Sequence, residues 1–199
     1  MHSVKGKTVR AVDAAVVAEW AARYRDVALD LGAGDGRFVR SLARTCPERG
    51  VIGVDTCQAN LKDSSRTAPA NALFVVADAL NLPDELDGLV THLTINFPWG
   101  SLLRGLLAGH DGLLAGLRDV GRAHVSLDVV LNAGALSEAG WPLDDGAGQI
   151  AAVLKRNGFA VRPVSVIGSD DLRGHPTTWA KRLAFGRDPR AIQINARLT

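Results

Sequence analysis

The stretch VALDLGAGDGR (residues 27–37) decides the fold. A short apolar run, typical of a buried strand, is followed by glycines at alternate positions, Gly32, Gly34 and Gly36, and then by the helical pattern GRFVRSLARTC. Glycines let the backbone turn tightly and approach a ligand closely, and the start of a helix offers free N–H groups. The next apolar run, VIGVD, ends in Asp55, about twenty residues further on, where a carboxylate can bind both hydroxyls of a ribose. This order predicts a nucleotide-type cofactor site between a strand and a helix.

Two cofactors suit such a loop. Dinucleotide enzymes prefer the spacing G-x-G-x-x-G, because a pyrophosphate lies against the helix start. Here the spacing is G-x-G-x-G, and Asp30 precedes it. An acid at this position would repel a pyrophosphate but suits the ammonium of a methionine moiety, so we favour S-adenosylmethionine, with S-adenosylhomocysteine as product, over NAD. Asp78, Ala79 and Leu80 would then border the adenine. The alternative for Asp30 is a carboxylate that caps the helix.

The rest of the chain alternates strands with helices. Strands are predicted at residues 27–31, 51–55, 72–78, 89–97, 123–131 and 159–167, and helices at 36–46, 58–67, 101–108, 111–119 and 144–158. The segments WAKRLAFG (179–186) and AIQINARL (191–198), joined by the turn RDPR, predict a closing hairpin. Continuous apolar strands between helices indicate a mostly parallel α/β sheet covered on both faces, with a late antiparallel strand.

Length and composition narrow the class of protein. A chain of 199 residues predicts one domain. No segment approaches the length of a membrane span, and the first residues lack the apolar core of a signal peptide, so a cytoplasmic protein is expected. Cys46 and Cys57 are expected to be free thiols, and no Cys or His spacing predicts a metal site.

The small net charge of +2 hides an uneven distribution. Residues 155–197 hold nine Lys and Arg against three Asp and Glu, and residues 1–25 hold five against two, whereas the middle is acidic. Such asymmetry favours a polyanionic partner. A solvated face with scattered arginines would explain the charges equally well.

Two tryptophans stand behind prolines. Pro98 and Trp99 follow the predicted strand at 89–97, and because proline does not suit a central strand, the indole is expected just past the strand's end, where α/β sheets bind ligands. Trp179 recurs in HPTTWAKRLAFGR, at a junction read as loop to strand. Two indoles at a donor site predict a clamp for a flat acceptor such as a base turned out of a nucleic-acid stack. The alternative is that both rings are core residues.

The motifs VKGKTVR (4–10), LDLGAGDGR, FPWGSLLRGLL and TTWAKRLAFGRD together resemble the aminoglycoside-resistance 16S rRNA methyltransferases, which modify N1 of the decoding-site adenine 1408. The resemblance implies a Rossmann-like class I S-adenosylmethionine-dependent fold in a single domain, residues 1–199. Its sheet would be mostly parallel and seven-stranded, with an antiparallel C-terminal strand and an N-terminal β-hairpin at residues 1–12. It also implies a monomer that acts on the small ribosomal subunit and confers resistance.

The resemblance assigns roles to individual residues. Trp99 and Trp179, with Pro98, would hold the flipped adenine. The methyl-donor site would be lined by Asp30, Gly32, Gly34, Asp55, Asp78, Ala79, Leu80, Asn96, Ser101 and Thr177. The rRNA would be gripped by Lys5, Lys7, Lys62, Arg66, Arg104, Arg182 and Arg187. Asn96 would hold the adenine amine or simply finish a strand. Adenine N1 carries a lone pair and no proton, so catalysis needs positioning rather than a general base.

One departure from the family stands out. Its members carry a lysine-rich helix after the second strand, whereas QANLKDSSRTAPA (58–70) offers only Lys62 and Arg66. Fewer phosphate contacts predict weaker, less salt-sensitive docking and less efficient methylation. Two alternatives remain open at this point: a small-molecule methyltransferase, and a poorly active relative that binds RNA or cofactor.

Overall fold

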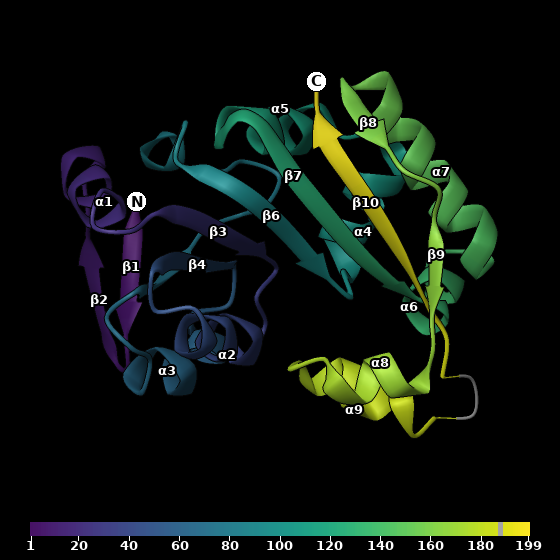
Figure 1. The fold of residues 1–199 in the computed structure, drawn as a ribbon, viewed down its shortest axis with the longest axis horizontal. Helices are drawn as coiled ribbons and strands as arrows, with labels where there is room; N and C mark the ends of the chain where they lie inside the picture. Colours follow the sequence, from purple (N-terminus) through teal and green to yellow (C-terminus); the bar gives the residue numbers. More distant parts are fainter. Residues whose placement is uncertain (187–188) are drawn as a thin grey trace.

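The computed structural model describes residues 1–186 and 189–199. At its centre lies β3 (Asp26–Leu31), the strand that precedes the glycine loop and is buried from Val27 onward. On one side it pairs with β4 (Arg49–Asp55), which pairs with β5 (Ala72–Val76), and on the other with β6 (Val90–Asn96), which pairs with β7 (Gly121–Asn132). All five strands are parallel, and their order reverses between β3 and β6 (Figure 1). Open α/β sheets bind ligands at such a switch point.

Antiparallel strands complete both ends of the sheet. The hairpin of β1 (His2–Lys5) and β2 (Thr8–Ala11) pairs with β5 through β1. At the other end β10 (Ala191–Leu198) lies between β7 and two short strands, β8 (Phe159–Val161) and β9 (Ser165–Ile167). The predicted N-terminal hairpin and antiparallel C-terminal strand are confirmed. When β8 and β9 are taken as one position, the sheet without the hairpin has the predicted seven strands.

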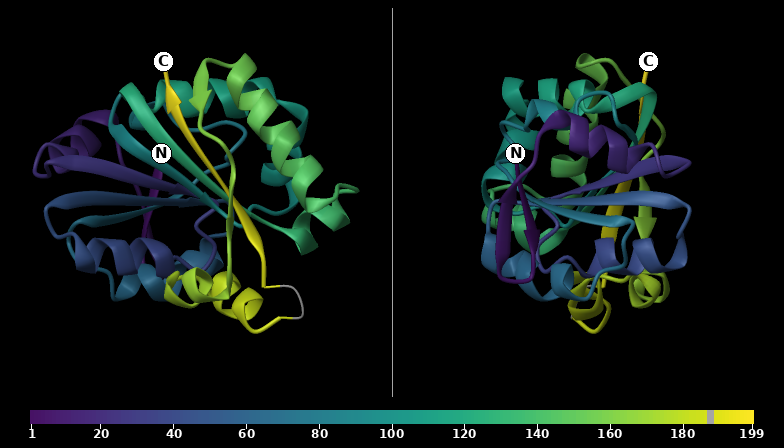
Figure 2. Two further views of the ribbon diagram at one scale, coloured as in Figure 1. Left: turned by 45° about the vertical axis from the view of Figure 1, so that its right-hand side comes forward. Right: turned by 90° about the vertical axis from the view of Figure 1, so that its left-hand side faces the viewer.

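Helices cover both faces of the sheet (Figure 2). On one face α2 (Arg37–Thr45) and α3 (Gln58–Arg66) enclose a smaller core around Val39, Leu61 and Phe74. The larger core lies on the opposite face, against α4 (Gly100–Ala108), α5 (Asp111–Asp119) and α7 (Leu143–Arg156). The remaining helical segments are α1 (Ala14–Ala21), the 3₁₀ turn η1 (Asp84–Leu86), α6 (Ala133–Glu138), α8 (Ser169–Gly174) and α9 (Thr178–Ala184).

Two predictions for the C-terminal part are wrong. The single strand expected at residues 159–167 is two strands, because Pro163 lacks an N–H for the ladder and separates β8 from β9. The segment WAKRLAFG is helical rather than a strand. Thr177 caps α9 by accepting the N–H of Ala180 at 3.0 Å, and Ala180 and Ala184, one turn apart, are both buried. Of the expected turn RDPR, the first two residues lie outside the described part of the chain.

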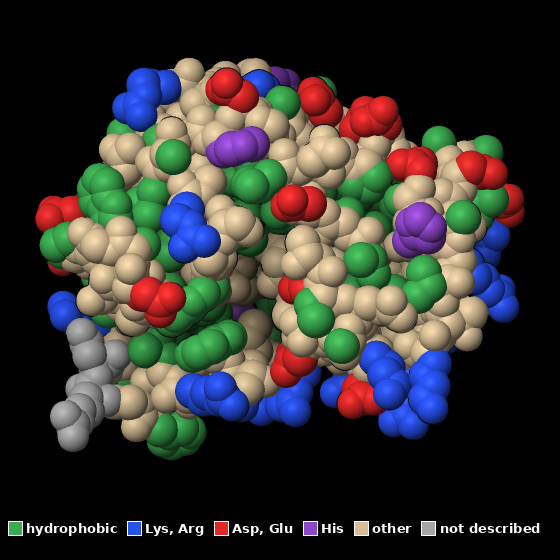
Figure 3. All heavy atoms as spheres, turned by 180° about the vertical axis from the view of Figure 1, so that it is seen from behind, with side chains coloured by type: hydrophobic (Ala, Val, Ile, Leu, Met, Phe, Trp, Pro, Cys, Tyr) green, Lys and Arg blue, Asp and Glu red, His purple; other side chains and the backbone are tan. Residues whose placement is uncertain are grey.

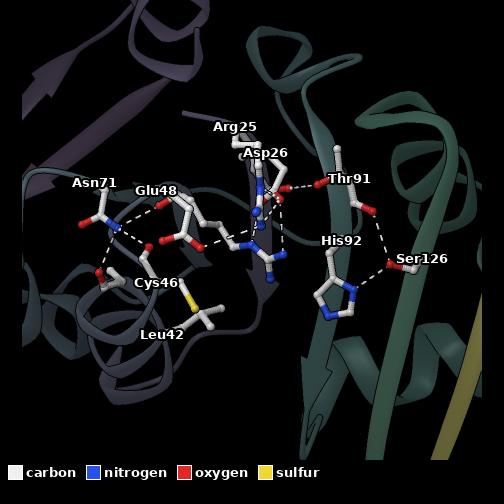
Figure 4. Close-up of polar contacts among 12 residues, drawn as sticks. Arg25, Asp26, Leu42, Cys46, Glu48, Asn71, Thr91, His92 and Ser126 are labelled. Carbon is white, nitrogen blue, oxygen red and sulfur yellow. Dashed lines mark hydrogen bonds and ion pairs between the residues drawn. The ribbon is translucent and has the colours of Figure 1, made fainter. Parts of the chain in front are cut away.

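Polar side chains hold the strand starts together at the edge of the sheet opposite the glycine loop (Figure 4). The side-chain amide of Asn71 donates to the carbonyl oxygen of Arg49 at 2.8 Å, and the guanidinium of Arg49 binds Asp26. On the neighbouring strands, His92 Nδ1 lies 2.7 Å from Ser126 Oγ. These contacts link neighbouring parallel strands near their amino ends. The loops that form the site lie at the opposite, carboxyl edge of the sheet.

Candidate active site

A cavity of about 370 Å³ opens at the carboxyl edge of β3, β4 and β6. The glycine loop, the ends of these strands and the first turns of α4 and α9 form its walls. Most of the predicted donor-site residues line it: Asp30, Gly32, Gly34, Asp55, Asp78, Ala79, Asn96, Ser101 and Thr177. Leu80 is the exception, because its side chain packs toward Gly105 of α4.

The glycine loop needs its glycines for two reasons. Gly32 and Gly36 have φ angles of +77° and +68°, a left-handed conformation that side chains disfavour. A Cβ on Gly32 would lie 2.8 Å from Leu102, and one on Gly36 would lie 2.6 Å from the ring of Phe74. The loop therefore packs closely between the two helix layers while its backbone faces the cavity.

Asp30 is a buried carboxylate at the base of the cavity, only 2% exposed. Its Oδ1 accepts hydrogen bonds from Thr94 Oγ1 at 2.9 Å and from Asn96 Nδ2 at 2.8 Å. Burial raises the pKa of Asp30 to about 7, against the effect of these two donors, and the nearby charge of Asp55 contributes. A ligand ammonium would stabilise this carboxylate, so the residues present fit the methionine end of S-adenosylmethionine.

These contacts decide two alternatives left open by the sequence. The N-cap of α2 is Gly36, so Asp30 does not cap that helix. The side-chain amide of Asn96 donates to the carboxylate of Asp30, so Asn96 does not simply finish a strand.

Asp55 stands at the end of β4, on the far side of the glycine loop. Its Oδ2 accepts the N–H of Gly34 and its Oδ1 accepts the N–H of Cys57, both at 2.8 Å. A carboxylate oxygen has a second lone pair, so both oxygens can still accept a ribose hydroxyl. Asp78, after β5, accepts the N–H of Leu80 at 2.9 Å and remains exposed.

The two tryptophans meet at the mouth of the cavity. The ring centroids of Trp99 and Trp179 are 5.7 Å apart, and their planes differ by 16°. The side chains are 42% and 50% exposed, so neither ring is a core residue. The guanidinium of Arg182 lies 5.5 Å from the Trp179 ring centroid.

The chain reaches Trp99 through a strained turn. Phe97, directly after β6, has a φ of +53°, which a non-glycine residue rarely adopts. Its buried ring packs with Leu172 and Ala180 of the α8–α9 segment, which holds the turn in place. Pro98 is also buried, and Trp99 follows as the N-cap of α4. The turn thus brings the indole from the sheet into the mouth of the cavity.

Several residues that line the cavity were not predicted from the sequence. Asp35 lies inside the glycine motif, and its Oδ2 accepts the hydroxyl of Thr178 at 2.7 Å. Phe38 of α2 stacks on His175, with centroids 5.6 Å apart. Burial lowers the pKa of His175, so its ring packs as neutral imidazole. The other lining residues not anticipated are Ala33, Val54, Thr56, Asn60, Ala77, Phe97 and Leu102. Asp35 could have been found from the sequence because it lies inside the glycine motif. Its contact with Thr178 could not, because the two residues are far apart in the chain.

The predicted RNA-binding residues occupy several elements. Lys5 is on β1, Lys7 in the hairpin turn, Lys62 and Arg66 on α3, Arg104 on α4 and Arg182 on α9. Arg187 lies outside the described residues. Lys and Arg side chains gather along the lower edge of the molecule in Figure 3, the edge where Figure 1 places α2, α3 and α9.

A feature not anticipated is a row of arginines along α2, formed by Arg37, Arg40 and Arg44. Two of them reach the end of α3: Arg40 donates to the hydroxyl of Thr67 at 3.1 Å and Arg44 to its carbonyl at 3.4 Å. The basic surface therefore continues from α3 onto α2.

Within the described residues, no helix is long and apolar enough to cross a membrane, and no cluster of His, Cys, Asp or Glu has the arrangement of a metal site.

A dinucleotide would bring a pyrophosphate to the glycine loop, where this fold presents the carboxylate of Asp30. Fold and cavity together define a class I S-adenosylmethionine-dependent methyltransferase. The chain belongs to the family of 16S rRNA (adenine(1408)-N(1))-methyltransferases, because the family model named NpmA, which carries that description, matches residues 2–198.

Individual relatives agree with this family. The 16S rRNA (adenine(1408)-N(1))-methyltransferase of Streptoalloteichus tenebrarius is 32% identical over 204 residues, which cover 94% of each chain. The crystal structure of the 16S rRNA methyltransferase KamB superposes over all of both chains with a TM-score of 0.90 and 29% identity. That of the aminoglycoside resistance methyltransferase NpmB1 covers 98% of this chain and all of that one, with a TM-score of 0.79 and 29% identity.

Proposed function

We propose that this protein transfers a methyl group from S-adenosylmethionine to N1 of adenine 1408 of 16S rRNA in the small ribosomal subunit, and thereby confers aminoglycoside resistance. The observation that carries the proposal is the pair of parallel, half-exposed indoles, Trp99 and Trp179, at the mouth of the donor cavity in a chain of this family. The resistance follows the description of the relative NpmB1.

The donor side of the cavity holds S-adenosylmethionine, which supplies an electrophilic methyl group on its sulfonium. Asp30 binds the ammonium, with Thr94 and Asn96 orienting its carboxylate. Asp55 accepts the ribose hydroxyls, and Asp78 with Ala79 borders the adenine. Gly32, Gly34, Ser101 and Thr177 complete the walls.

The acceptor side is the tryptophan pair. Bases stack about 3.4 Å apart, so a base held on both faces needs roughly 7 Å between the two rings. The centroids of Trp99 and Trp179 are 5.7 Å apart, so the rings separate when the flipped adenine enters. Stacking contributes roughly 1–3 kcal/mol per base and aromatic ring, which offsets much of the few kcal/mol needed to extrude the base.

The transfer itself needs little from side chains. Adenine N1 attacks the methyl carbon with its lone pair, the carbon–sulfur bond breaks, and its electrons stay on sulfur as S-adenosylhomocysteine forms. No proton leaves N1 before the attack. The titratable side chains that line the cavity in the described residues are all aspartates, Asp30, Asp35, Asp55 and Asp78. Catalysis is positioning, and the cationic product base is stabilised by the two indoles through cation–π attraction.

Docking on the rRNA uses the basic edge of the molecule. Lys5, Lys7 and Arg182 bind phosphates there, together with Arg104 of α4, the helix that begins after Trp99, and Arg187, five residues beyond Arg182 in the chain. The helix α3 offers only Lys62 and Arg66, and this weakens docking through α3 relative to members of the family whose helix is lysine-rich. The arginine row of α2 provides additional phosphate contacts beside it.

The protein acts as a monomer in the cytoplasm, where the small subunit is found. A monomer is sufficient for methylation of the rRNA, because one basic edge of the molecule carries both the tryptophan pair and the proposed RNA-binding residues.

Incubation of the purified protein with labelled S-adenosylmethionine tests the function. Isolated small subunits, naked 16S rRNA and a metabolite extract are offered as separate acceptors. We expect incorporation into small subunits, with a primer-extension stop at adenine 1408. Label only in metabolites would contradict the proposal in favour of a small-molecule methyltransferase, and cofactor binding without any transfer would indicate a binding protein.

Weaker docking through α3 has its own test. Expressed at the same level in one bacterial host, this protein should give less aminoglycoside resistance and a partial primer-extension stop compared with a lysine-rich relative. Equal resistance with a stop of full strength would contradict weakened docking, without affecting the proposed reaction.

A further inference from the structure

The α8–α9 segment brings Trp179 to the cavity and contacts the glycine loop directly. The hydroxyl of Thr178, the residue before Trp179, donates to Asp35 Oδ2 at 2.7 Å. Both residues line the donor cavity. The same carboxylate binds Arg37, through the N–H at 3.2 Å on Oδ1 and through Nε at 3.3 Å from Oδ2.

On its other side Asp35 is linked to the ribose site. Its neighbour Gly34 donates its N–H to Asp55 at 2.8 Å. Its own carbonyl oxygen accepts the hydroxyl of Ser64 of α3. Asp55 and Trp179 are therefore connected in four steps. Asp55 is hydrogen-bonded to Gly34, Gly34 is followed in the chain by Asp35, Asp35 is hydrogen-bonded to Thr178, and Thr178 is followed by Trp179.

The two halves of the base clamp differ in how they are held. Trp99 follows the buried Phe97 and Pro98 and is the N-cap residue of α4, so it is tied to the end of β6 and to a helix that packs on the larger core. Trp179 lies on the first turn of the seven-residue α9, which packs on a small apolar cluster and is bonded to Asp35 through Thr178. When the rings separate to admit a base, we expect the Trp179 side to move, because α9 is short and lies outside the sheet.

We propose that Asp35 is a positioning residue that couples the donor site to the base clamp through its hydrogen bond to Thr178. This inference rests on the proposed function. S-adenosylmethionine bound at Asp55 orders the glycine loop, which aligns Asp35 with Thr178 and holds Trp179 opposite Trp99. Binding free energies are reciprocal, so the cofactor strengthens capture of the base, and the captured base strengthens binding of the cofactor by the same factor.

The free protein provides the first test, which requires no RNA. Near-ultraviolet circular dichroism reports the stacked indoles, and S-adenosylhomocysteine is the titrant. Wild type and Thr178→Ser, which keeps the hydroxyl, should show a change in the indole signal at saturation. Thr178→Val, of the same shape without the donor, should lose it, with saturation by the ligand verified for each variant by calorimetry. A change of equal size in Thr178→Val, or no change in wild type, overturns the proposal.

The second test measures binding to small subunits with and without S-adenosylhomocysteine. In wild type and Thr178→Ser the ligand should tighten binding about fivefold or more, and in Thr178→Val the ratio should fall close to one. Thr45→Val is the matched control and should keep the wild-type ratio, because the Thr45 hydroxyl at the end of α2 donates to the carbonyl oxygens of Ser41 and Leu42 in its own helix. An unchanged ratio in Thr178→Val contradicts the coupling.

Two further measurements distinguish a failure of the coupling from a variant that does not fold and from a failure of the proposed function. If Thr178→Val fails to fold, Asp35→Asn replaces it, because asparagine keeps an acceptor oxygen but loses the charge, and its ratio should lie between those of wild type and one. If no variant binds or methylates small subunits, the proposed function fails, and the dichroism titration of the free protein still decides the coupling.

Discussion

The two hydrogen bonds that Asp30 accepts both fall on Oδ1, from Thr94 and Asn96. Burial raises the pKa of this carboxyl from its ordinary 3.8 to about 7. Between these two pH values the folded protein holds a proton that the unfolded chain has released. Asp30 therefore stabilises the fold fully below about pH 4, and this contribution is lost as the pH rises through about 7.

The change Asp30→Asn tests this directly. Asparagine keeps an oxygen for both donors and carries no charge, so the free energy of unfolding without cofactor should exceed that of wild type at pH 8, by up to a few kcal/mol. The difference should shrink toward pH 4, which urea unfolding across the pH range will show. Affinity for S-adenosylmethionine, measured by calorimetry at pH 7.5, should fall by at least about tenfold, or 1.4 kcal/mol. A variant with wild-type affinity would contradict the role of Asp30.

The tryptophan pair makes a second prediction at this scale. Trp99→Ala and Trp179→Ala should each lower methyl transfer to small subunits by a hundredfold or more, because each removes one stacking face worth roughly 1–3 kcal/mol and the alignment of N1 with it. Both rings are half exposed, so the melting temperature and cofactor affinity should change little. Trp141→Phe, remote from the cavity, serves as the control. Near-normal turnover in both alanine variants would reject base stacking.

Among the helices and strands, α9 is the clearest case in which the sequence pattern did not predict the observed secondary structure. The turn RDPR between WAKRLAFG and AIQINARL favoured a hairpin strand, yet the deciding signals were the capping hydroxyl of Thr177 and two alanines one turn apart. Seven residues are too few for a clear helical period. The glycine loop was predictable because strand, loop, helix and spaced acid all agreed. The bond between Asp35 and Thr178 was not, because it depends on how distant segments pack.

The arginine row of α2 carries a prediction at this scale. The double change Arg40→Gln and Arg44→Gln should weaken binding to small subunits and lower the slope of log affinity against log salt by about 1 to 2. The double change Lys155→Gln and Arg156→Gln, at the exposed end of α7 on the other face of the sheet, is the charge-matched control. An equal loss in both pairs would mean that net charge, and not α2, drives the docking.

For the whole molecule, continuous apolar strands separated by helices were enough to predict the parallel sheet and its antiparallel last strand. A site just past the ends of the strands followed from that class of fold, whereas the order of the strands was not predicted from the sequence. The interruption of the strand at 159–167 and the left-handed turn at Phe97 depend on single residues in their tertiary setting, and periodicity does not report them.

The N-terminal hairpin has two roles that can be separated. It covers the edge of β5 and carries Lys5 and Lys7. Deletion of residues 1–12 should expose an unpaired strand edge and cause self-association, detectable by light scattering, together with weaker binding to small subunits. The double change Lys5→Gln and Lys7→Gln should weaken that binding alone. A monomeric, stable deletion variant would show that the hairpin does not protect the edge.

The place of β10 has a consequence for how the enzyme is made. This strand is translated after β8 and β9 but inserts between them and β7, and the α8–α9 segment, which carries Trp179, lies between β9 and β10 in the chain. During synthesis β7, β8 and β9 therefore emerge before the strand that joins them, and the segment that carries Trp179 is expected to be anchored at both ends only after residues 191–198 have left the exit tunnel. The cavity wall that carries Thr177 and Trp179 is therefore expected to be completed last in synthesis, as β10 pairs with β7.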